Sequence, residues 1–204
     1  MNLIFQYLFL AIISYLIGSI PFSLIFAKLI KGIDVRFAGS GNVGETNTLI
    51  SAGKRAGTLA TLFDLAKSLG AIVLARVFVG TDLSIIIAGL AVILGHDFSI
   101  YLNFKGGKGI APTAGAIIAI DPYAMLIVLL VYLIFLAATR YLILSSLLVL
   151  LALPFIFLFL NDGFQYIVFG FAVFLIALYT HRADIKRLIS GNEARIGSAL
   201  TRMV

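Results

Sequence analysis

Residues 39–47 have the composition of an anion-binding loop. These nine positions hold three glycines and four short hydroxyl or amide residues, which are Ser40, Asn42, Thr46 and Asn47. Glycine allows successive backbone N–H groups to face one anion, and short polar side chains add donors without bulk. A helix beginning at Thr46 and Asn47 would add its own free N–H groups. An ordinary inter-helix loop is the alternative, and the spacing lacks the Gly-Lys-Ser or Gly-Lys-Thr of a nucleotide P-loop.

A second candidate is the stretch 104–109, in which Lys105 and Lys108 stand among three glycines. Two ammonium groups on a flexible backbone suit phosphate oxygens or anionic headgroups. A loop that only anchors the orientation of the chain is the alternative. Gly106 and Gly107, which separate the lysines, favour a binding role, because anchoring needs charge and no backbone freedom.

The third cluster is His181, Asp184 and Arg187, spaced i, i+3 and i+6 and followed by Gly191 and Glu193. On a helix the first two side chains lie on nearly the same face. A histidine at a helix–membrane boundary is more often structural than catalytic. All three clusters fall on one side of the predicted membrane, and this favours a shared site.

Five further polar residues must be placed within an apolar chain. Asp64 and Lys67 lie at i and i+3 within a predicted span, so we expect them to pair with each other inside the bundle. His96 faces either the site or lipid headgroups. Ser145 and Ser146 are either site hydroxyls or donors to their own helix backbone.

The elements that must position these residues follow from composition. Hydrophobic residues make up 62% of the 204 positions and charged ones 12%, and the mean hydropathy is +1.14. Soluble domains are about half apolar and a quarter charged, so a soluble enzyme, a secreted disulfide module and a disordered chain are excluded. There is no cysteine, and the formal net charge is +6. In such a chain this charge indicates cytoplasmic loops and anionic ligands, and no nucleic acid partner is expected.

The sequence predicts an all-α polytopic membrane protein with seven transmembrane helices, the fourth of them short. A spanning helix needs about 20 mostly apolar residues. The expected segments are 3–30, 56–79, 83–102, 110–120, 123–139, 142–160 and 164–180. Pro21 lies inside the first and is expected to break it near Gly18. That segment resembles a signal peptide, but no cleavage site follows, so it is interpreted as a span.

The basic residues set the expected orientation. They gather in alternate loops and in the tail, as Lys28, Lys31, Arg36, Lys54, Arg55, Lys105, Lys108, Arg140, Arg182, Lys186, Arg187, Arg195 and Arg202. The opposite loops hold Asp82, Asp121 and Asp162, with Arg76 nearby. Lysine and arginine favour the cytoplasmic side, so the N-terminus is predicted outside and the C-terminus inside. Residues 1–204 are expected to form one domain whose tail is a short amphipathic helix ending near Gly191.

At these residues the sequence resembles the acyl-phosphate:glycerol-3-phosphate acyltransferases, the PlsY family of bacterial membranes. The resemblance runs along essentially the whole chain. Its matching pieces are residues 18–22, 39–44, 46–47, 53–54, 64, 67, 94–96, 104–109, 139–141, 181–182, 187, 191 and 193. Each piece alone is weakly specific, whereas their order and spacing together are highly specific.

The resemblance implies a multi-pass enzyme of the bacterial inner membrane with its active site on the cytoplasmic face. It implies transfer of an acyl group from acyl phosphate to the 1-hydroxyl of glycerol 3-phosphate, giving lysophosphatidic acid and phosphate. No metal, coenzyme A or other cofactor is implied, no acyl-enzyme forms, and the donor phosphate takes up the hydroxyl proton. The partners are the two substrates and the bilayer, and a monomer is expected.

The expected site residues follow from the same resemblance. The catalytic set is Ser40, Asn42, Lys108 and His181. The substrate-binding set is Gly41, Gly44, Thr46, Asn47, Lys105, Gly106, Gly107, Ser145, Ser146 and Asp184. No metal ligands are expected. The interpretation requires that the segments containing Asn42, Lys108 and His181 converge on one cavity that holds two anions.

Five positions depart from the pattern of the family: Glu45, Ile50, Pro112, Ile143 and Asp184. Glu45 and Asp184 add carboxylates, and Ile50 stands where an arginine is expected. Three of the five departures make the local formal charge more negative, which is unfavourable near phosphorylated substrates. Relocated phosphate contacts (Lys54 and Arg55 would supply charge if they turned inward), a different substrate and a weakened paralogue are the explanations.

Two alternatives to the acyltransferase remain open. One is a non-catalytic or altered-substrate paralogue that binds anionic lipid precursors. The other is a membrane transporter or lipid-binding protein that uses the same basic face. A carrier should show broken helices meeting near the bilayer midplane and an internal duplication, and no duplication is visible in the sequence.

Overall fold

The computed structural model describes residues 2–196, so Arg202 of the predicted basic tail lies outside the described residues. The described part of the chain is helical and contains no strand. Its longer helices are α1 (Leu3–Ser19), α4 (Lys54–Phe78), α5 (Asp82–Asp97), α6 (Ile110–Ile120), α7 (Pro122–Thr139), α8 (Leu142–Leu160) and α9 (Phe164–Thr180). The shorter ones are α2 (Phe22–Lys31), α3 (Glu45–Ala52), α10 (Arg182–Ile189) and two 3₁₀ turns, η1 (Val35–Phe37) and η2 (Ile100–Leu102).

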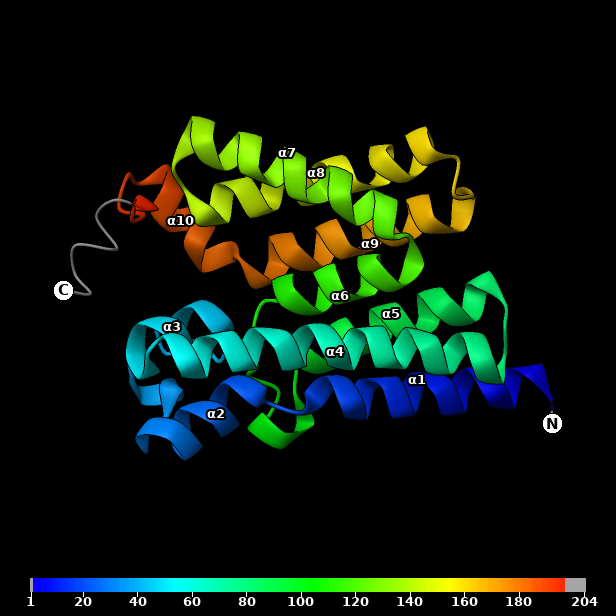
Figure 1. The fold of residues 1–204 in the computed structure, drawn as a ribbon, viewed down its shortest axis with the longest axis horizontal. Helices are drawn as coiled ribbons and strands as arrows, with labels where there is room; N and C mark the ends of the chain where they lie inside the picture. The colour runs from blue at the N-terminus through cyan, green and yellow to red at the C-terminus, as the bar shows by residue number, and fades with distance from the viewer. Residues whose placement is uncertain (1, 197–204) are drawn as a thin grey trace. The chain divides into compact units, whose positions relative to one another are not determined.

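The chain divides into two compact units, residues 1–120 and residues 121–204. In the first unit α1 packs along α5, and α4 packs against α2, α3, α5 and α6 (Figure 1). In the second unit α8 packs against both α7 and α9, and α10 follows α9. The anion-loop candidates of the sequence lie in the first unit, and the His181 cluster lies in the second.

The first apolar segment is broken where the sequence predicts a break. Ser19 ends α1 and Phe22 begins α2, and of the two residues between them Ile20 is extended and Pro21 is neither helical nor extended. The carbonyls freed at the break are satisfied from within the unit. The Ile20 oxygen accepts a hydrogen bond from Lys67 Nζ at 3.1 Å, and the Ser19 oxygen accepts one from Ser99 Oγ at 2.6 Å. Broken helices are tolerated at membrane depth only where protein groups satisfy the backbone in this way.

The third apolar segment ends at Leu102, as the sequence predicts, but it is not one continuous helix. Helix α5 stops at Asp97, and the 3₁₀ turn η2 completes the segment. The cause is tertiary: Gly106 N–H donates to the Asp97 carbonyl and Gly107 N–H to the His96 carbonyl, both at 3.0 Å. These carbonyls end the helix on the returning loop.

Local sequence sets several other helix ends. Thr81 and Ser84 form a reciprocal capping box at the start of α5. Asp121 caps α7 by accepting from the Tyr123 N–H at 2.8 Å, and Pro122 occupies the first helical position, where a missing N–H has no cost. In the tail, the amphipathic α10 ends close to Gly191, as the sequence predicts.

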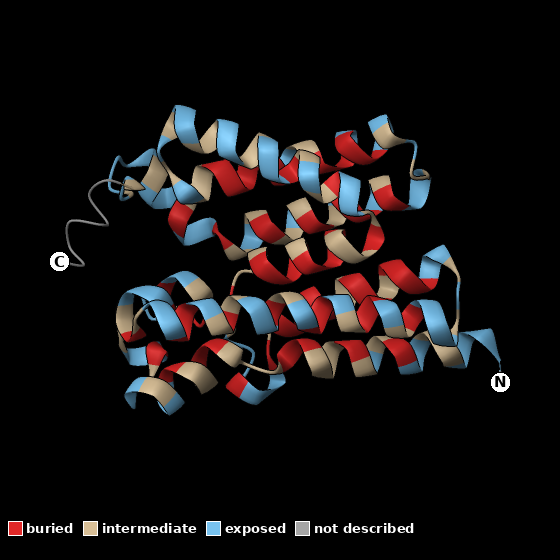
Figure 2. Cartoon of the chain, viewed as in Figure 1, coloured by how far each residue is buried: buried red, intermediate tan, exposed pale blue. Residues whose placement is uncertain are grey.

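Side chains are distributed as expected for a protein whose solvent is partly hydrocarbon. Large apolar side chains on the outside are bare, such as Phe9 at 56% and Val77 at 74% exposure, whereas Asp64 and Lys67 are buried (Figure 2). By length and hydropathy five helices within residues 2–196 qualify as spans, or six if α9 and α10, bent by 68°, count as one broken span. Helix α6, with 11 residues, is the short segment that the sequence indicates.

Glycine sets the close packing of α1 on α5 and gives a test of the fold. A Cβ on Gly18 would lie 2.1 Å from the Val92 carbonyl oxygen, which is main chain and has no rotamer to escape into. Overpacking of this kind costs about 1–3 kcal/mol, so Gly18→Ala should lower the midpoint of thermal unfolding in detergent by several degrees.

Gly70→Ala is the matched control for this test. Gly70 lies in α4, and a Cβ placed on it would have no neighbouring atom within 4 Å. Alanine is favoured over glycine in a helix interior, so this variant should unfold at the wild-type temperature or slightly above it. Equal losses in the two variants would contradict the packing argument.

Candidate functional site

The loop 39–47 is organised around one buried amide. Asn47, 3% exposed, accepts the Ser40 N–H on Oδ1 at 2.9 Å. The two N–H groups of its Nδ2 are shared among the carbonyl oxygens of Val35, Ala38 and Asn42, at 3.0, 3.0 and 2.9 Å. The sequence assigns Asn47 to substrate contact, whereas the structure shows that both ends of this amide already hold the loop together.

Glycine is required at particular points of this loop. Gly39 and Gly41 have positive φ angles of 58° and 73°, and a Cβ on Gly39 would lie 2.2 Å from Asn47 Oδ1. Gly44 precedes α3, which begins at Glu45. Ser40, Gly41 and Thr46 are exposed, and Asn42 is partly so. Polar groups at the surface of the loop are therefore presented by a rigid backbone.

The second loop is packed rather than flexible, which corrects the sequence-based interpretation. Besides the two backbone hydrogen bonds that end α5, a Cβ on Gly106 would lie 1.9 Å from the His96 carbonyl oxygen, and one on Gly107 would lie 2.1 Å from His96 Nε2. The glycines here provide close approach to α5 instead of mobility. Lys105 is exposed, and Lys108 is half-buried.

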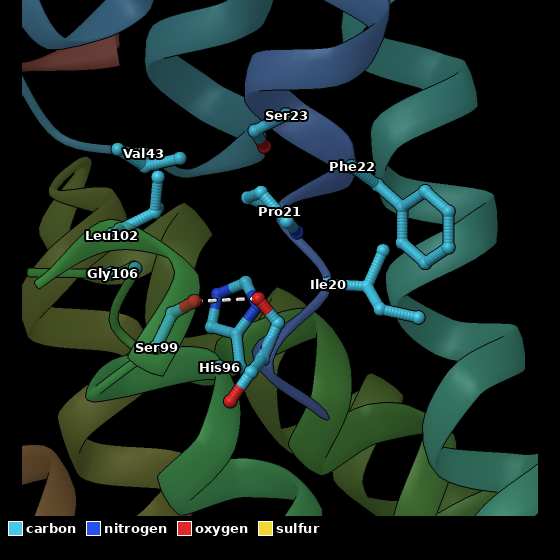
Figure 3. A pocket seen from close by; sticks show the side chains of 11 residues that line it. Ile20, Pro21, Phe22, Ser23, Val43, His96, Ser99, Leu102 and Gly106 are labelled. Atoms are coloured by element: carbon cyan, nitrogen blue, oxygen red, sulfur yellow. Dashed lines mark hydrogen bonds between the residues drawn. The ribbon is translucent and has the colours of Figure 1, made fainter. Parts of the chain in front are cut away.

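The two loops meet within the first unit. Val43 of the first loop and Gly106 and Gly107 of the second line one hollow of about 180 Å³ including its opening, together with His96 (Figure 3). The break between α1 and α2 supplies the other wall through Ser19, Ile20, Pro21, Phe22 and Ser23. Segments far apart in the sequence are therefore brought together beside His96.

A buried ionic network lies behind the hollow. Lys67 Nζ is 2.6 Å from Asp64 Oδ1 and 2.9 Å from His96 Nδ1, and all three side chains are at least 94% buried. The expected pairing of Asp64 with Lys67 is confirmed. His96 faces this network rather than lipid headgroups, so one of the two sequence-based alternatives is excluded.

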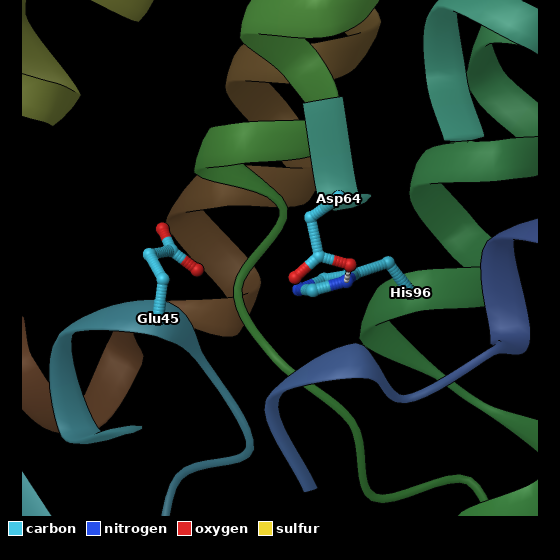
Figure 4. Close-up of side chains that lie close together, drawn as sticks. All are labelled: Glu45, Asp64 and His96. Carbon is cyan, nitrogen blue, oxygen red and sulfur yellow. Dashed lines mark ion pairs between the residues drawn. The ribbon is translucent and has the colours of Figure 1, made fainter. Parts of the chain in front are cut away.

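Glu45 brings another carboxylate to the network. One donor atom each from Glu45, Asp64 and His96 lies within 4.8 Å of the others (Figure 4). Burial raises the pKa of the Glu45 carboxyl above its ordinary value. The trio has the donor types of a metal site, but Lys67 already binds Asp64 and His96 as the cation. The network therefore carries its own positive charge where a metal ion would stand.

In the second unit the His181 cluster is also held by neighbouring groups. His181 and Asp184 are both buried, as expected for one helix face. The ring Nδ1–H donates to the Ala177 carbonyl at 2.9 Å, which leaves the acceptor lone pair of the neutral ring on Nε2. Arg187 binds Asp184 and also donates to Glu193 at 2.8 Å. Asp184 therefore has its carboxylate fixed by a cation.

The two serines of α8 bond to their own helix. Ser145 Oγ donates to the Tyr141 carbonyl at 2.7 Å, and Ser146 Oγ donates to the Leu142 carbonyl at 3.0 Å. This is the second of the alternatives that the sequence leaves open. Each hydroxyl oxygen keeps acceptor capacity, so their assignment to substrate stays a prediction.

The structure also locates the other residues that depart from the family pattern. Ile50 is 47% exposed at the surface of α3. Pro112 is the third residue of α6, a position whose N–H has no partner within the helix. Lys54 and Arg55, proposed from the sequence as substitutes for a missing arginine, are both exposed at the start of α4. Nothing in the structure explains Ile143.

Sequence reasoning left the location of His96 open and did not identify the role of Gly106 and Gly107. The available signal was the short spacing between His96 and the glycine pair, with a predicted helix end between them. That spacing allows the loop to return onto the helix, but only the structure shows the hydrogen bonds that fix it.

The fold and these loops define a helical integral membrane protein with two glycine-rich loops at one buried network. A family model described as Glycerol-3-phosphate acyltransferase matches residues 8–191. The glycerol-3-phosphate acyltransferase of Desulforamulus reducens is 41% identical and aligns over 92% of this chain and 94% of its own. That of Clostridioides difficile is 39% identical over 95% and 97%.

Solved structures agree with this result. The crystal structure described as PlsY (YgiH), an integral membrane glycerol 3-phosphate acyltransferase, in its glycerol 3-phosphate form, has a TM-score of 0.89 and 34% identity, covering 96% of this chain and 98% of that one. Its lysophosphatidic acid form has a TM-score of 0.88. The chain therefore belongs to the glycerol-3-phosphate acyltransferase family. The enzyme class expected from the sequence is confirmed.

The role of Asn47 in organising its loop can be tested with an isosteric change. Asn47→Asp removes the Nδ2 donors from three backbone carbonyls and places a carboxylate against them. Each unsatisfied buried group costs about 1–3 kcal/mol, so thermal stability should fall and turnover, measured as phosphate release, should fall by more than tenfold.

Ser51→Ala serves as the control, because Ser51 only makes a 3.3 Å contact with Asn47 Oδ1. This variant should keep near wild-type stability and turnover. If Asn47→Asp behaved like Ser51→Ala, the loop would not depend on the Asn47 amide.

Proposed function

We propose that the protein transfers the acyl group of an acyl phosphate to the 1-hydroxyl of glycerol 3-phosphate. The hydroxyl oxygen attacks the carbonyl carbon, the bond from that carbon to the phosphate oxygen breaks, and the hydroxyl proton leaves with the phosphate. The products are lysophosphatidic acid and phosphate. The acceptor is supported by the family to which the chain belongs, and the donor by the resemblance of its motifs.

The observation that carries the proposal is the meeting of two loops at one hollow. Val43 belongs to a loop rich in glycine and hydroxyl groups, and Gly107 belongs to a loop that carries two lysines. Both substrates of the reaction carry phosphate. Ammonium groups and oriented N–H donors are the chemistry that neutralises phosphate and the developing carbonyl charge.

The site residues take the following roles in this proposal. Ser40, Gly41, Asn42, Gly44 and Thr46 provide phosphate and hydroxyl contacts, and Lys108, assisted by Lys105, neutralises phosphate. His181 accepts a hydrogen bond from a substrate hydroxyl on Nε2, which its bond to Ala177 favours. Asp184, Ser145 and Ser146 orient the acceptor.

The same proposal sets the protein in its membrane. Residues 1–204 act as one catalytic domain that spans the bacterial inner membrane seven times, with the N-terminus outside and the C-terminus in the cytoplasm. The basic loops then lie on the cytoplasmic face, where both phosphorylated substrates are available. A monomer is sufficient, because every proposed residue comes from one chain.

A comparison of two lysine variants tests whether the lysines act in the site or only anchor the protein in the membrane. Purified protein should release phosphate from palmitoyl phosphate when glycerol 3-phosphate is added. Lys108→Ala removes a charged phosphate contact worth about 1.5–3 kcal/mol, so its turnover should fall at least tenfold while the protein stays folded.

Lys31→Ala is the control, because Lys31 is exposed at the end of α2 and carries a similar charge at the same face. It should leave turnover near the wild-type value. Equal effects of the two variants would mean that the lysines act through orientation alone. A folded wild-type preparation without turnover would exclude the proposed reaction.

An altered-substrate acyltransferase is the second candidate, and Glu45 favours it. The Glu45 carboxyl stands beside Asp64 at the start of α3, so the first loop carries a negative group where an anion is expected. If the phosphate site is intact but weakened, Ile50→Arg should lower the KM for glycerol 3-phosphate several-fold. An unchanged or higher KM would favour a different acceptor.

A further inference from the structure

The tautomer of His96 is fixed by its neighbour. Lys67 Nζ has three protons and three acceptors in reach: Ile20 O at 3.1 Å, Asp64 Oδ1 at 2.6 Å and His96 Nδ1 at 2.9 Å. A buried ammonium has no acceptor capacity. Asp64 Oδ1 also lies 3.4 Å from His96 Nδ1, but the ammonium of Lys67 is closer, at 2.9 Å, and can only donate. We therefore assign Nδ1 as the acceptor and place the proton of the neutral ring on Nε2.

That Nε2–H is a buried donor without a partner among the described residues. His96 is 6% exposed, and its Nε2 makes no hydrogen bond. It abuts the bare Cα of Gly107, where a Cβ would lie only 2.1 Å away. A buried donor left unpaired costs about 1–3 kcal/mol of folding free energy. This cost is unusual in a ring whose other nitrogen, Nδ1, is hydrogen-bonded to Lys67.

Two further polar atoms around the same hollow are also unpaired in the described structure. Ser19 Oγ and Ser23 Oγ are buried and make no hydrogen bond, and both residues line the hollow with His96. Figure 3 shows Ser23 and His96 at the hollow. Three orphaned groups from three segments converge where Gly107 removes the obstruction of a side chain. The hollow is too narrow to enclose a water-sized group, so a ligand oxygen would approach Nε2 from its opening.

The surrounding charges indicate the kind of oxygen. Lys108 follows Gly107 directly, and Lys67 lies on the other side of the imidazole. The competing acceptors are Asp64, whose Oδ1 lies 3.4 Å from Nδ1, and Glu45, which has a carboxylate oxygen within 4.8 Å of a His96 nitrogen. No hydrogen bond joins either carboxylate to Nε2. A lysine next to the glycine that covers Nε2, together with the Lys67 ammonium at Nδ1, favours an oxygen that carries negative charge.

We propose that His96 is a substrate-positioning residue whose Nε2–H donates to a phosphoryl oxygen of a bound substrate. The inference rests on the proposed function, because both of its substrates supply such an oxygen. Lys67 acts through His96 by holding the donor tautomer. His96 thereby links the ionic network to the lysine-bearing loop.

Two substitutions separate the two ring nitrogens. The amide of Asn resembles Nδ1 of histidine, so His96→Asn keeps the acceptor for Lys67 and loses the donor at Nε2. The amide of Gln reaches the Nε2 position, so His96→Gln keeps the donor. We expect His96→Asn to weaken binding of inorganic phosphate by about ten- to a hundredfold, and His96→Gln to bind within a few-fold of wild type.

The KM values of the variants show which substrate's phosphate His96 contacts. A rise in the KM for glycerol 3-phosphate alone would place His96 on the acceptor, and a rise for acyl phosphate alone would place it on the donor. Equal behaviour of the two variants, or weaker binding by His96→Gln than by His96→Asn, would overturn the proposal. Weaker binding by His96→Gln would mean that phosphate binding depends on the acceptor at Nδ1 and not on the donor at Nε2.

Nitrogen NMR of the wild-type chain in detergent gives a readout that needs no variant and no turnover. The sequence has two histidines, so ¹⁵N-histidine labelling gives two rings, which a His181 variant assigns. We expect the His96 proton on Nε2 and a shift of that resonance on titration with inorganic phosphate. This result would stand even if the acyl transfer reaction were absent.

Two NMR outcomes would overturn the inference. One is a proton on Nδ1 of His96. The other is an Nε2 resonance that ignores phosphate but moves in Glu45→Gln without any ligand, which would make Glu45 the partner of the donor.

Discussion

The first unit depends on the buried ammonium of Lys67. Its three acceptors come from the broken first segment, from its own helix α4 and from α5. A single charged group therefore compensates the carbonyl freed at Ile20, neutralises Asp64 and orients His96. A charge is costly at this depth unless it is paired and hydrogen-bonded, and here every proton has an acceptor. The arrangement of the surrounding helices follows from that requirement.

Close approach by glycine extends the same arrangement to the loops. His96 can lie under the second loop only because Gly106 and Gly107 have no side chains, and α1 reaches α5 only because Gly18 and Gly95 are bare. In these segments glycine permits close backbone packing and does not provide flexibility. In a membrane interior, where association between helices gains little from the hydrophobic effect, such backbone proximity is a major source of packing energy.

The loop that contains Asn42 has a different structural role, which is to present polar groups on a fixed backbone. A membrane enzyme for phosphorylated substrates must present donors without unfolding its own backbone. The Asn47 amide takes over the inward carbonyls of the turn, so Ser40, Gly41 and Thr46 can face outward. Rigidity of the loop is then independent of whether a ligand is present, which is the preorganisation that charge stabilisation requires.

Much of the architecture could be predicted from the sequence, because it depends on short-range patterns. Long apolar runs defined the helices, Pro21 defined the break, and the spacing of Asp64 and Lys67 defined their ion pair. The candidate loops were also visible, since glycine, lysine and short polar residues cluster there. By contrast, the end of α5, the rigid second loop and the donor at His96 depend on main-chain atoms distant in sequence.

The sequence by itself therefore determined the class of protein, the helices and the candidate segments for phosphate binding. Only the tertiary structure decided which of those groups serve the fold and which remain available. The side-chain amide of Asn47 is hydrogen-bonded within its own loop, whereas the Nε2–H of His96 has no partner among the described residues. The physical reason is that hydrogen-bond capacity is finite, so the role of a polar group depends on how many of its partners the folded chain already supplies.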